Sequence, residues 1–529
     1  MLNPKSIIHP QTSPARRCRP WLWLLPLLAS CATLHPYKKP DDAAANLYRG
    51  VSTTDTTSVA TMPWRSVFAD AQLQKLLEEG LNQNLDLRIA LTRIQRAEAN
   101  LAQSRAAFLP SLSARGTATV ARVSNGNTGV GTVTGTGTTG TGGTGTGGTG
   151  TGGTGTGGTG TGGTGGTGTG GTGTGGTTGT TDPSTVVTSR YSQQYLLTLS
   201  SSWEADVWGK LRSTKRSYVA TLLQSEAYRR AVQTQLLADI ANNYYLLLAY
   251  DAQLEITRQT VEFRLKDVEV TKLLKTAAIV TGAAVAQSEA NLYAAQVSIP
   301  DLQRSIRETE NTISILVNRS PGAIERSTLA AQAQPELLQT GVPSQLLRNR
   351  PDVQEAEAAY RSYFEQTNAA RAYFYPSFTI TANGGLTNTT ITDLFSPNAI
   401  FGTLVGGVLQ PIFNQGLNRA RLRNAQALQE EYRYTYQQTL LTAGQEVSNA
   451  LFAYQTAGEK AAIRVNQLAS LRRAVDFTQE LLRYSSANYT DVLTSQQSLL
   501  AAELSSINDR LQQLQATTDL YHALGGGWR

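Results

Sequence analysis

Cysteine and histidine are scarce in this chain, which has two cysteines and three histidines among its 529 residues. After residue 30 there remain one cysteine, Cys31, and two histidines that lie far apart, His35 and His522. This set cannot supply an internal disulfide, a Cys/His metal cluster or a Cys–His nucleophile pair. With no assembled set of catalytic groups, the sequence predicts a protein that is not an enzyme and holds no cofactor or metal.

An excess of charge of one sign and long apolar runs are also lacking. The formal net charge of the whole chain is +7. Four of its basic residues, Lys5, Arg16, Arg17 and Arg19, lie in the first 30 residues, which contain no acidic residue. The rest of the chain has 42 basic and 39 acidic residues, so its net charge is +3. This near balance gives no reason to expect a nucleic acid partner. After residue 30 no run of 18 apolar residues occurs, so the sequence predicts no transmembrane helix.

The first 30 residues have the architecture of a secretory signal peptide. Arginines precede a short apolar run at 21–28, and the small residues Ala29 and Ser30 precede Cys31. A cysteine at this position is typical of a bacterial lipoprotein signal, in which the thiol is lipidated and becomes part of the mature N-terminus. We therefore expect a lipoprotein signal peptide at 1–30 and lipidation of Cys31. An ordinary signal peptide followed by a chance cysteine is the alternative.

Residues 126–181 are almost entirely glycine and threonine. Such a tract has little apolar surface to bury and a high ordering entropy, so we expect a disordered loop in solvent. Gly135 to Gly140 match a dinucleotide-binding pattern, but no strand and helix surround them, so a chance match within the repeat is the better interpretation.

Outside this tract the chain repeats itself at two constant offsets. Identical residues recur 266 positions apart, as in Phe108 and Phe374, and further along they recur 207 positions apart, as in Gly209 and Gly416. The two offsets differ by 59, which is close to the length of the Gly/Thr tract. The sequence therefore predicts an internal duplication, with the tract inserted into a loop of the first copy.

Each copy begins with a helical pattern and continues with segments that alternate. A helix is expected over 71–107, ended by Pro110, and apolar and polar residues alternate over 111–123 and 195–207. The second copy repeats the alternation from Ser377, while 400–409 is rich in glycine and alternates poorly. Alternation with a polar face fits a membrane barrel strand. Taken alone, however, it favours a half-buried strand of a soluble sheet, because the signal of a membrane strand is weak in any one segment.

Long helices follow the strands in both copies. A continuous helix over 213–281 would be about 100 Å long, and a second segment at 283–316, interrupted by Pro300, is expected to run back beside it with a kink. The second copy repeats this arrangement at 418–483 and 491–524. Short turns predict antiparallel pairs, with a buried stripe that includes Leu236, Ile240, Tyr244 and Leu247.

Pro351 is suited to the first position of a helix. Asp352 and Glu355 would then lie near the positive end of the helix dipole. Arg348 and Arg350 come just before this helix, and we expect both to be solvated surface charges.

Several ordered motifs together carry a family resemblance. They are Pro36–Pro40, Trp64 with Phe68 and Asp70, Trp203–Gly209, Pro343–Val353, Gln410–Gly416, Glu446–Leu451 and Ala523–Trp528. They span nearly the whole chain after residue 30, apart from the Gly/Thr tract. On these motifs the chain resembles the TolC family of outer-membrane efflux factors, in its NodT-like lipoprotein branch.

The resemblance implies a mainly helical fold with membrane β-structure. Long antiparallel coiled-coil helices would form a periplasmic α-barrel, and four strands per protomer would form a trimeric 12-stranded outer-membrane β-barrel. After the signal peptide at 1–30, the expected domains are a lipidated N-terminal segment at 31–63, a first strand/helix repeat at 64–322 with its extracellular insert at 126–181, a linker at 323–343 and a second repeat at 344–529.

The implied function is that of an outer-membrane channel, the exit duct of a tripartite efflux system. The duct would passively conduct small molecules to the exterior, in a homotrimer anchored to outer-membrane lipid. Its partners would be a periplasmic adaptor and an inner-membrane pump of the resistance-nodulation-division type. The alternative is a non-conducting trimeric envelope adhesin or spacer, for which the Gly/Thr tract would be a surface tether.

The resemblance also implies a gate at the periplasmic tip of the helices. Asp491 matches a family aperture aspartate and Tyr484 matches a gate tyrosine, but the arginine expected between them is missing and Thr494 replaces a second acid. Three Asp491 carboxylates in a trimer would favour cations at the narrowest point. Asp491 is equally suited to capping a helix. The corresponding tip of the first copy, 275–287, contains no acid.

Overall fold

A computed structural model describes residues 35–39, 60, 62–122, 191–332, 349–484 and 489–528. The expected signal peptide, Cys31 and the Gly/Thr tract lie outside these residues. The chain divides into two compact units. The smaller unit, 112–201 and 382–404, holds most of the strand residues, and the larger unit holds the α-helices and the remaining strand ends.

The elements alternate between short strands and long helices. Their bounds are α2 (Trp64–Val67), α3 (Ala71–Gln83), α4 (Leu85–Ala106), β1 (Ser111–Arg122), β2 (Tyr191–Ala205), α5 (Lys210–Thr276), α6 (Gly282–Leu316), α8 (Pro351–Ala372), β3 (Ser377–Asn388), β4 (Ile400–Leu409), α9 (Leu417–Arg483) and α10 (Tyr489–Ala523). Pro300 lies inside α6, which continues as one helix through it. Among the described residues, no helix combines the length and the apolarity needed to cross a lipid bilayer.

The two halves of the chain correspond element by element. Helices α4 and α8 each have 22 residues, α5 and α9 each have 67, and α6 and α10 each have 35. Strands β1 and β3 each have 12. Gly209 and Gly416 precede α5 and α9 with φ of 77° and 82°, a left-handed conformation that glycine adopts without steric cost. The offsets seen in the sequence are therefore offsets between equivalent structural elements.

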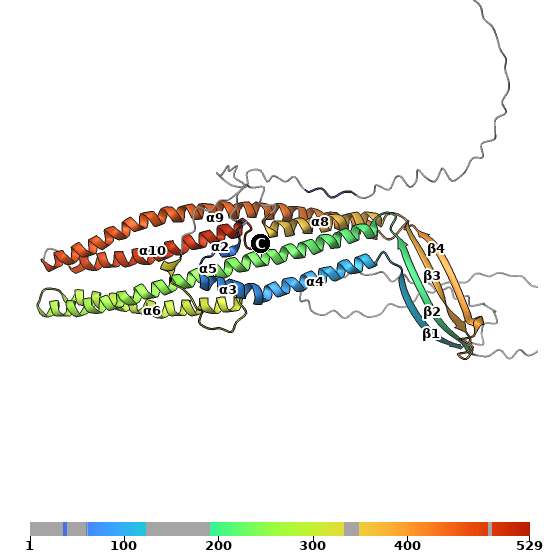
Figure 1. Cartoon of the computed structure of the whole chain (residues 1–529), viewed down its shortest axis with the longest axis horizontal. Coiled ribbons are helices and arrows are strands. Elements are labelled where there is room, and N and C mark those ends of the chain that lie inside the picture. Colours follow the sequence, from blue (N-terminus) through green and yellow to red (C-terminus); the bar gives the residue numbers. More distant parts are fainter. Residues whose placement is uncertain are drawn as a thin grey trace, which may run out of the picture. The chain divides into compact units, whose positions relative to one another are not determined.

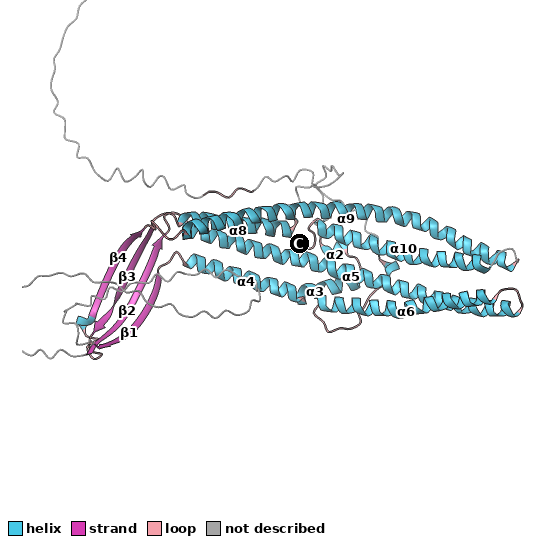
Figure 2. Ribbon diagram, turned by 180° about the vertical axis from the view of Figure 1, so that it is seen from behind, coloured by secondary structure: helices cyan, strands magenta, loops and turns pink. Residues whose placement is uncertain are grey.

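The four strands form one sheet in the order β1-β2-β3-β4 (Figure 2). Large apolar side chains of the sheet are exposed, including Leu112 at 69% and Leu404 at 76%. In a soluble half-buried sheet these residues would be covered by a core. The outer edges of β1 and β4 have no neighbouring strand among the described residues, so the sheet is open on both sides.

The long helices pair within each half. Helix α6 runs back beside α5, and α10 runs back beside α9 (Figure 1). The predicted stripe is buried as expected, with Ile240, Tyr244 and Leu247 fully covered and Leu236 nearly so. These side chains join residues of α3, α6 and α10 in the main hydrophobic cluster.

The prediction of one helix across 71–107 is wrong, because the chain breaks at Asn84 into α3 and α4. Asn84 has an extended ψ of 134°, and its side-chain oxygen accepts a hydrogen bond from the backbone N–H of Leu87 at 3.1 Å. Its amide nitrogen donates to the carbonyl of Leu316 at 2.9 Å. An asparagine that caps a new helix and binds a distant carbonyl ends the first helix without any proline or glycine.

Candidate functional site

The two gate residues predicted from the sequence lie at the same end of the second helical hairpin. Tyr484 directly follows α9 and is 74% exposed, while Asp491 lies exposed in the first turn of α10. Residues 485–488, between them in the sequence, lie outside the described residues. An acid in a first turn also interacts favourably with the helix dipole, so Asp491 is equally suited to stabilising the start of α10.

Two polar contacts join the first hairpin to the second near this end. The hydroxyls of Ser288 on α6 and Tyr489 on α10 lie 3.3 Å apart, and both side chains are buried. The amide of Gln497 donates to Asn291 Oδ1 at 3.1 Å. Sequence reasoning missed these residues, because serine, asparagine and glutamine are common on exposed helix faces. Ser288, Asn291 and Tyr489 are buried in the structure, while Gln497 is exposed.

A half-buried ionisable pair on α5 adds to this contact between hairpins. Burial raises the pKa of Asp267, although a hydrogen bond with Gln496 and the charge of Arg264 oppose the shift. Burial likewise lowers the pKa of Arg264, against the effect of Asp267. The Arg264 guanidinium donates to the backbone carbonyl of Asn291 on α6, within the first hairpin, and it is the hydrogen bond of Asp267 with Gln496 on α10 that crosses to the second hairpin. The hairpins therefore meet through polar and titratable groups as well as apolar side chains.

Arg350 is the centre of a second polar cluster, where α8, α9 and α10 meet. Its Nε and Nη2 donate to the two carboxylate oxygens of Asp352 at 3.0 and 2.6 Å, and its Nη1 lies 2.6 Å from Glu446 Oε2. Nη1 also donates to the carbonyl of Ala523 at 3.0 Å. Arg350 is only 4% exposed, so the expectation of a solvated surface charge is wrong for this residue. Its partners on α9 and α10 come close only in the tertiary structure. Arg348 lies outside the described residues.

The electrostatics of this cluster follow from burial and from the charge of Arg350. Burial opposes ionisation of Asp352, but its hydrogen bonds and ion pair with Arg350 outweigh burial and lower its pKa. Burial lowers the pKa of His522, and the nearby Arg350 charge lowers it further. Burial raises the pKa of Glu355. The cluster therefore favours an ionised Asp352 beside a neutral His522.

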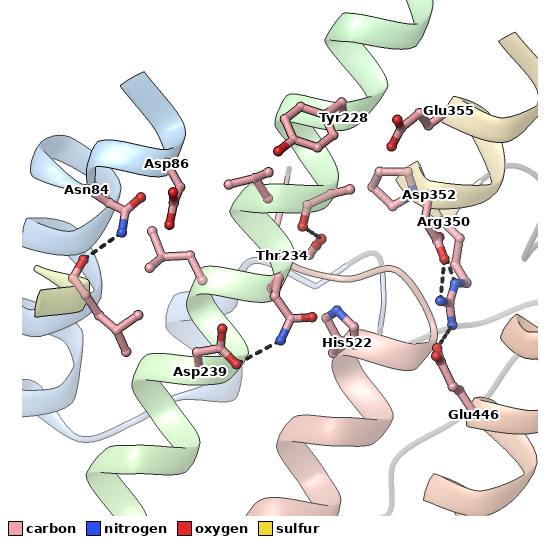
Figure 3. Close-up of a pocket in the computed structure, with 16 residues that line it drawn as sticks. Asn84, Asp86, Tyr228, Thr234, Asp239, Arg350, Asp352, Glu355, Glu446 and His522 are labelled. Atoms are coloured by element: carbon pink, nitrogen blue, oxygen red, sulfur yellow. Dashed lines mark hydrogen bonds and ion pairs between the residues drawn. The ribbon is translucent and has the colours of Figure 1, made fainter. Parts of the chain in front are cut away.

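The side chains of this cluster line a cavity of about 470 Å³ (Figure 3). They are Arg350, Asp352, Glu355, Glu446 and His522. The wall also includes Asn84, which ends α3, and Asp239, which accepts a hydrogen bond from Gln235 at 2.8 Å. Ionisable groups from α4, α5, α8, α9 and α10 thus meet around one space. Among the described residues, no group of three histidine, cysteine or acidic side chains could hold a metal ion. The arrangement fits a structural junction of helices.

Comparison with known proteins adds sequence and fold relatives. A family model described as outer membrane efflux protein matches residues 167–319 and 342–526. The probable efflux pump outer membrane protein TtgC of Pseudomonas putida is 28% identical over 515 residues, which cover 95% of this chain and 94% of that protein. The pyoverdine export outer membrane protein OpmQ of Pseudomonas putida is 30% identical over 341 residues, 64% of this chain and 72% of that protein.

Solved structures share the fold. The outer-membrane channel OprN has a TM-score of 0.75 at 23% identity, covering 94% of this chain and 99% of that chain. The open state of the Neisseria gonorrhoeae MtrE outer membrane channel has a TM-score of 0.74 at 22% identity, covering 94% of this chain and 98% of that chain. The mainly helical fold with a four-stranded sheet is therefore that of TolC-like channels. Since the family model matches both halves of the chain, the protein belongs to the outer membrane efflux protein family.

Proposed function

We propose that this outer-membrane efflux protein is the exit duct of a tripartite efflux system, conducting small molecules passively to the exterior. The observation that carries the proposal is a four-stranded sheet with two open edges and exposed apolar side chains, in one chain with two 67-residue helices. A membrane accounts for the exposed apolar face, and the helices are long enough to reach far into the periplasm. The similarity to the probable efflux pump outer membrane protein TtgC also supports this function.

The working unit we propose is a homotrimer. Open edge strands are templates for further strand pairing, and a closed barrel removes them. Pairing β4 of one copy with β1 of the next would close three four-stranded sheets into a 12-stranded barrel. The helices of the three copies would then surround one periplasmic tunnel. A periplasmic adaptor and a pump of the resistance-nodulation-division type are the proposed partners, and the duct itself is proposed to have no enzyme activity.

The proposed domain boundaries remain those of the sequence: signal peptide 1–30, N-terminal segment 31–63, repeats 64–322 and 344–529, and linker 323–343. The insert at 126–181 would lie in an extracellular loop.

The proposed lipid anchor is supported by the path of residues 35–39. The carbonyl of His35 accepts a hydrogen bond from Asn368 at 3.0 Å, and Lys39 pairs with Glu357 at 2.5 Å. This segment therefore lies along α8, with its earlier residue nearer the end that leads into β3. Cys31 is four residues upstream, a reach of about 14 Å. Mass spectrometry of the N-terminal peptide, with Cys31→Ser as the control, tests the acylation.

The proposed gate lies at the hairpin ends. Tyr484 and Asp491 would line the narrowest part of the tunnel, and the contacts of Ser288 with Tyr489 and of Asn291 with Gln497 would hold the two hairpins of each copy together. Opening then requires these hydrogen bonds to be exchanged for hydrogen bonds with water, which costs little net free energy and keeps the gate reversible.

Single-channel recording tests the central claim. The purified protein is added to planar lipid bilayers, with detergent alone as the control, and we expect discrete conductance steps. The absence of a pore under all voltages and salt concentrations would favour the alternative, a non-conducting envelope spacer or adhesin.

A further inference from the structure

The segment that joins β4 to α9 carries the most exposed large apolar side chains of the described residues. Ile412 is 97% exposed and Phe413 is 85% exposed. Leu409 at the end of β4 and Leu417 at the start of α9 are also exposed. These four residues are called the β4–α9 patch below. So much apolar surface in a defined loop indicates a partner that covers it.

Two arginines follow the patch on α9. Arg419 and Arg423 are one helical turn apart and both are exposed. Within the part of the chain that the structure describes, neither forms an ion pair. Arg421, between them in sequence, instead lies over the ring of Tyr373 at 4.0 Å. Arg419 and Arg423 are called the junction arginines, and they leave two positive charges beside the patch.

The equivalent junction of the first copy has neither feature. Asp206 accepts hydrogen bonds from the backbone N–H of Leu211 and from the backbone and side chain of Arg212, each at 3.0 Å. Lys210 pairs with Glu204 at 2.6 Å. At the offset of 207, Phe413 stands in the place of Asp206 and Pro411 in that of Glu204, while Arg419 stands in the place of Arg212. The second copy thus has an apolar, cationic junction where the first has an ion-paired one.

We propose that the β4–α9 patch and the junction arginines form a binding site for anionic phospholipid of the inner leaflet. Ile412 and Phe413 enter the acyl region, and Arg419 and Arg423 bind the lipid phosphate. An apolar group flanked by arginines is suited to the interface, where acyl chains and phosphates lie next to each other. The inference rests on the proposed outer-membrane barrel, because β4 then ends at the bilayer surface.

Charge argues against a second copy of the chain as the occupant. In the proposed trimer the edge strand β1 of the next copy would lie beside β4. The segment 99–122, which leads into and forms β1, contains Arg105, Arg115 and Arg122 and no acidic residue. That segment would add positive charge next to Arg419 and Arg423 and would supply no compensating anion. Phosphatidylglycerol supplies both the anion and the acyl chains.

Native mass spectrometry of the full-length oligomer in neutral detergent tests the site. Phosphatidylglycerol is titrated against phosphatidylcholine for the wild type and for two variants. Arg419→Gln/Arg423→Gln removes the cations, and Phe413→Asp introduces the carboxylate found at Asp206. The control Arg258→Gln/Arg307→Gln removes two exposed arginines elsewhere. We expect the wild type and the control to prefer phosphatidylglycerol, and both test variants to bind it at least about tenfold more weakly.

The outcomes separate the possible occupants. Unchanged phosphatidylglycerol binding by the double arginine variant overturns the proposal, whether or not Phe413→Asp folds. Equal binding of both lipids by the wild type also overturns the proposal. So does full displacement of bound phosphatidylglycerol by glycerol 3-phosphate at equal concentration, because that would indicate a site for soluble anions. Loss of the oligomer in Phe413→Asp, with normal lipid binding by the arginine variant, assigns the patch to a second copy. We expect channel conductance to be retained in every variant. If the wild type itself shows no conductance, the result contradicts the proposed exit duct and not the proposed lipid site.

Discussion

The hydroxyl of Tyr489 lies 3.3 Å from the hydroxyl of Ser288, and this contact joins the second helical hairpin to the first. Both side chains are buried, with Ser288 only 2% exposed. A hydroxyl that loses its partner and stays buried has no hydrogen bond, which costs free energy until water reaches it. Any motion that separates α6 from α10 near their hairpin ends must therefore break this contact and solvate both groups.

Tyr489→Phe is expected to loosen the closed tip. The substitution keeps the ring but leaves the Ser288 hydroxyl without this partner, which costs about 1 kcal/mol of stability at the hairpin contact. We expect a higher resting conductance in planar bilayers. Tyr434→Phe is the matched control, because Tyr434 is exposed and its hydroxyl donates to Glu430 within the same helix. Equal resting conductance of both variants and the wild type would show that Tyr489 has no part in gating.

Asp491→Asn tests whether the predicted aperture carboxylate acts through its charge. Asparagine keeps the hydrogen-bonding geometry but removes the negative charge that would favour cations in the tunnel. We expect reversal potentials in a salt gradient to shift toward lower cation selectivity, and Asp491→Ala to raise resting conductance as well. If selectivity is unchanged while thermal stability falls, Asp491 serves only the start of α10.

Arg350→Met is expected to destabilise the larger unit strongly. Methionine fills much of the volume but leaves the Ala523 carbonyl without its buried donor, and the carboxylates of Asp352 and Glu446 without their shared cation. Because the two carboxylates are 37% and 43% exposed, water screens part of the loss, and we expect about 1–3 kcal/mol. Thermal unfolding followed by circular dichroism measures the effect. Arg304→Met on α6 is the control, since Arg304 pairs only with Asp301 and Glu308 on the same exposed helix face. A similar melting temperature for both variants would contradict the central role of Arg350.

His522 is expected to make stability depend on pH below about 6.5, the usual pKa of histidine. Burial and Arg350 lower the pKa of His522 in the folded protein, while Glu446, Asp352 and Asp519 oppose the shift. The unfolded chain therefore binds a proton first as the pH falls, so stability is lost between pH 6.5 and the lower folded pKa. Unfolding midpoints of the wild type should fall across this range, and those of His522→Gln should fall less. Parallel curves would exclude this linkage.

Gly525→Ala is expected to disturb the loop after α10. Gly525 has a φ of 84°, and an added Cβ would lie 2.6 Å from the carbonyl oxygen of Asn349. Strain of about 1–3 kcal/mol should lower the melting temperature. Gly458→Ala on α9 is the control, because nothing lies within 4 Å of its added Cβ and alanine favours a helix by about 1 kcal/mol. A tolerated Gly525→Ala would mean that the loop can shift away from Asn349.

Local regularity explains why much of the fold could be predicted. Alternation over 111–123 and 195–207 identified β1 and β2, and the lack of proline over 213–281 identified the long α5. The repeated residues, such as Gly209 and Gly416, identified equivalent elements because both copies need the same backbone conformation before a long helix. These patterns depend on neighbours along the chain, so one sequence reveals them.

The candidate site was predicted less well. Asp491 and Tyr484 were found by resemblance, whereas Tyr489, Ser288 and Arg350 were missed or taken for surface residues. An arginine before Pro351 looks the same in the sequence whether it faces water or Glu446. The break at Asn84 was missed for a similar reason, since the carbonyl of Leu316 that it binds is 232 residues away.

The sequence by itself determined the element types, their lengths and the duplication, because these follow from side-chain periodicity and backbone preference. Only the tertiary structure decided which polar groups meet, such as the buried Arg350 with Glu446 and the buried Ser288 with Tyr489. It also left the β4–α9 patch and the apolar face of the sheet exposed. The burial of a charge or an apolar side chain depends on what packs against it, and that is set by contacts between segments distant in the chain.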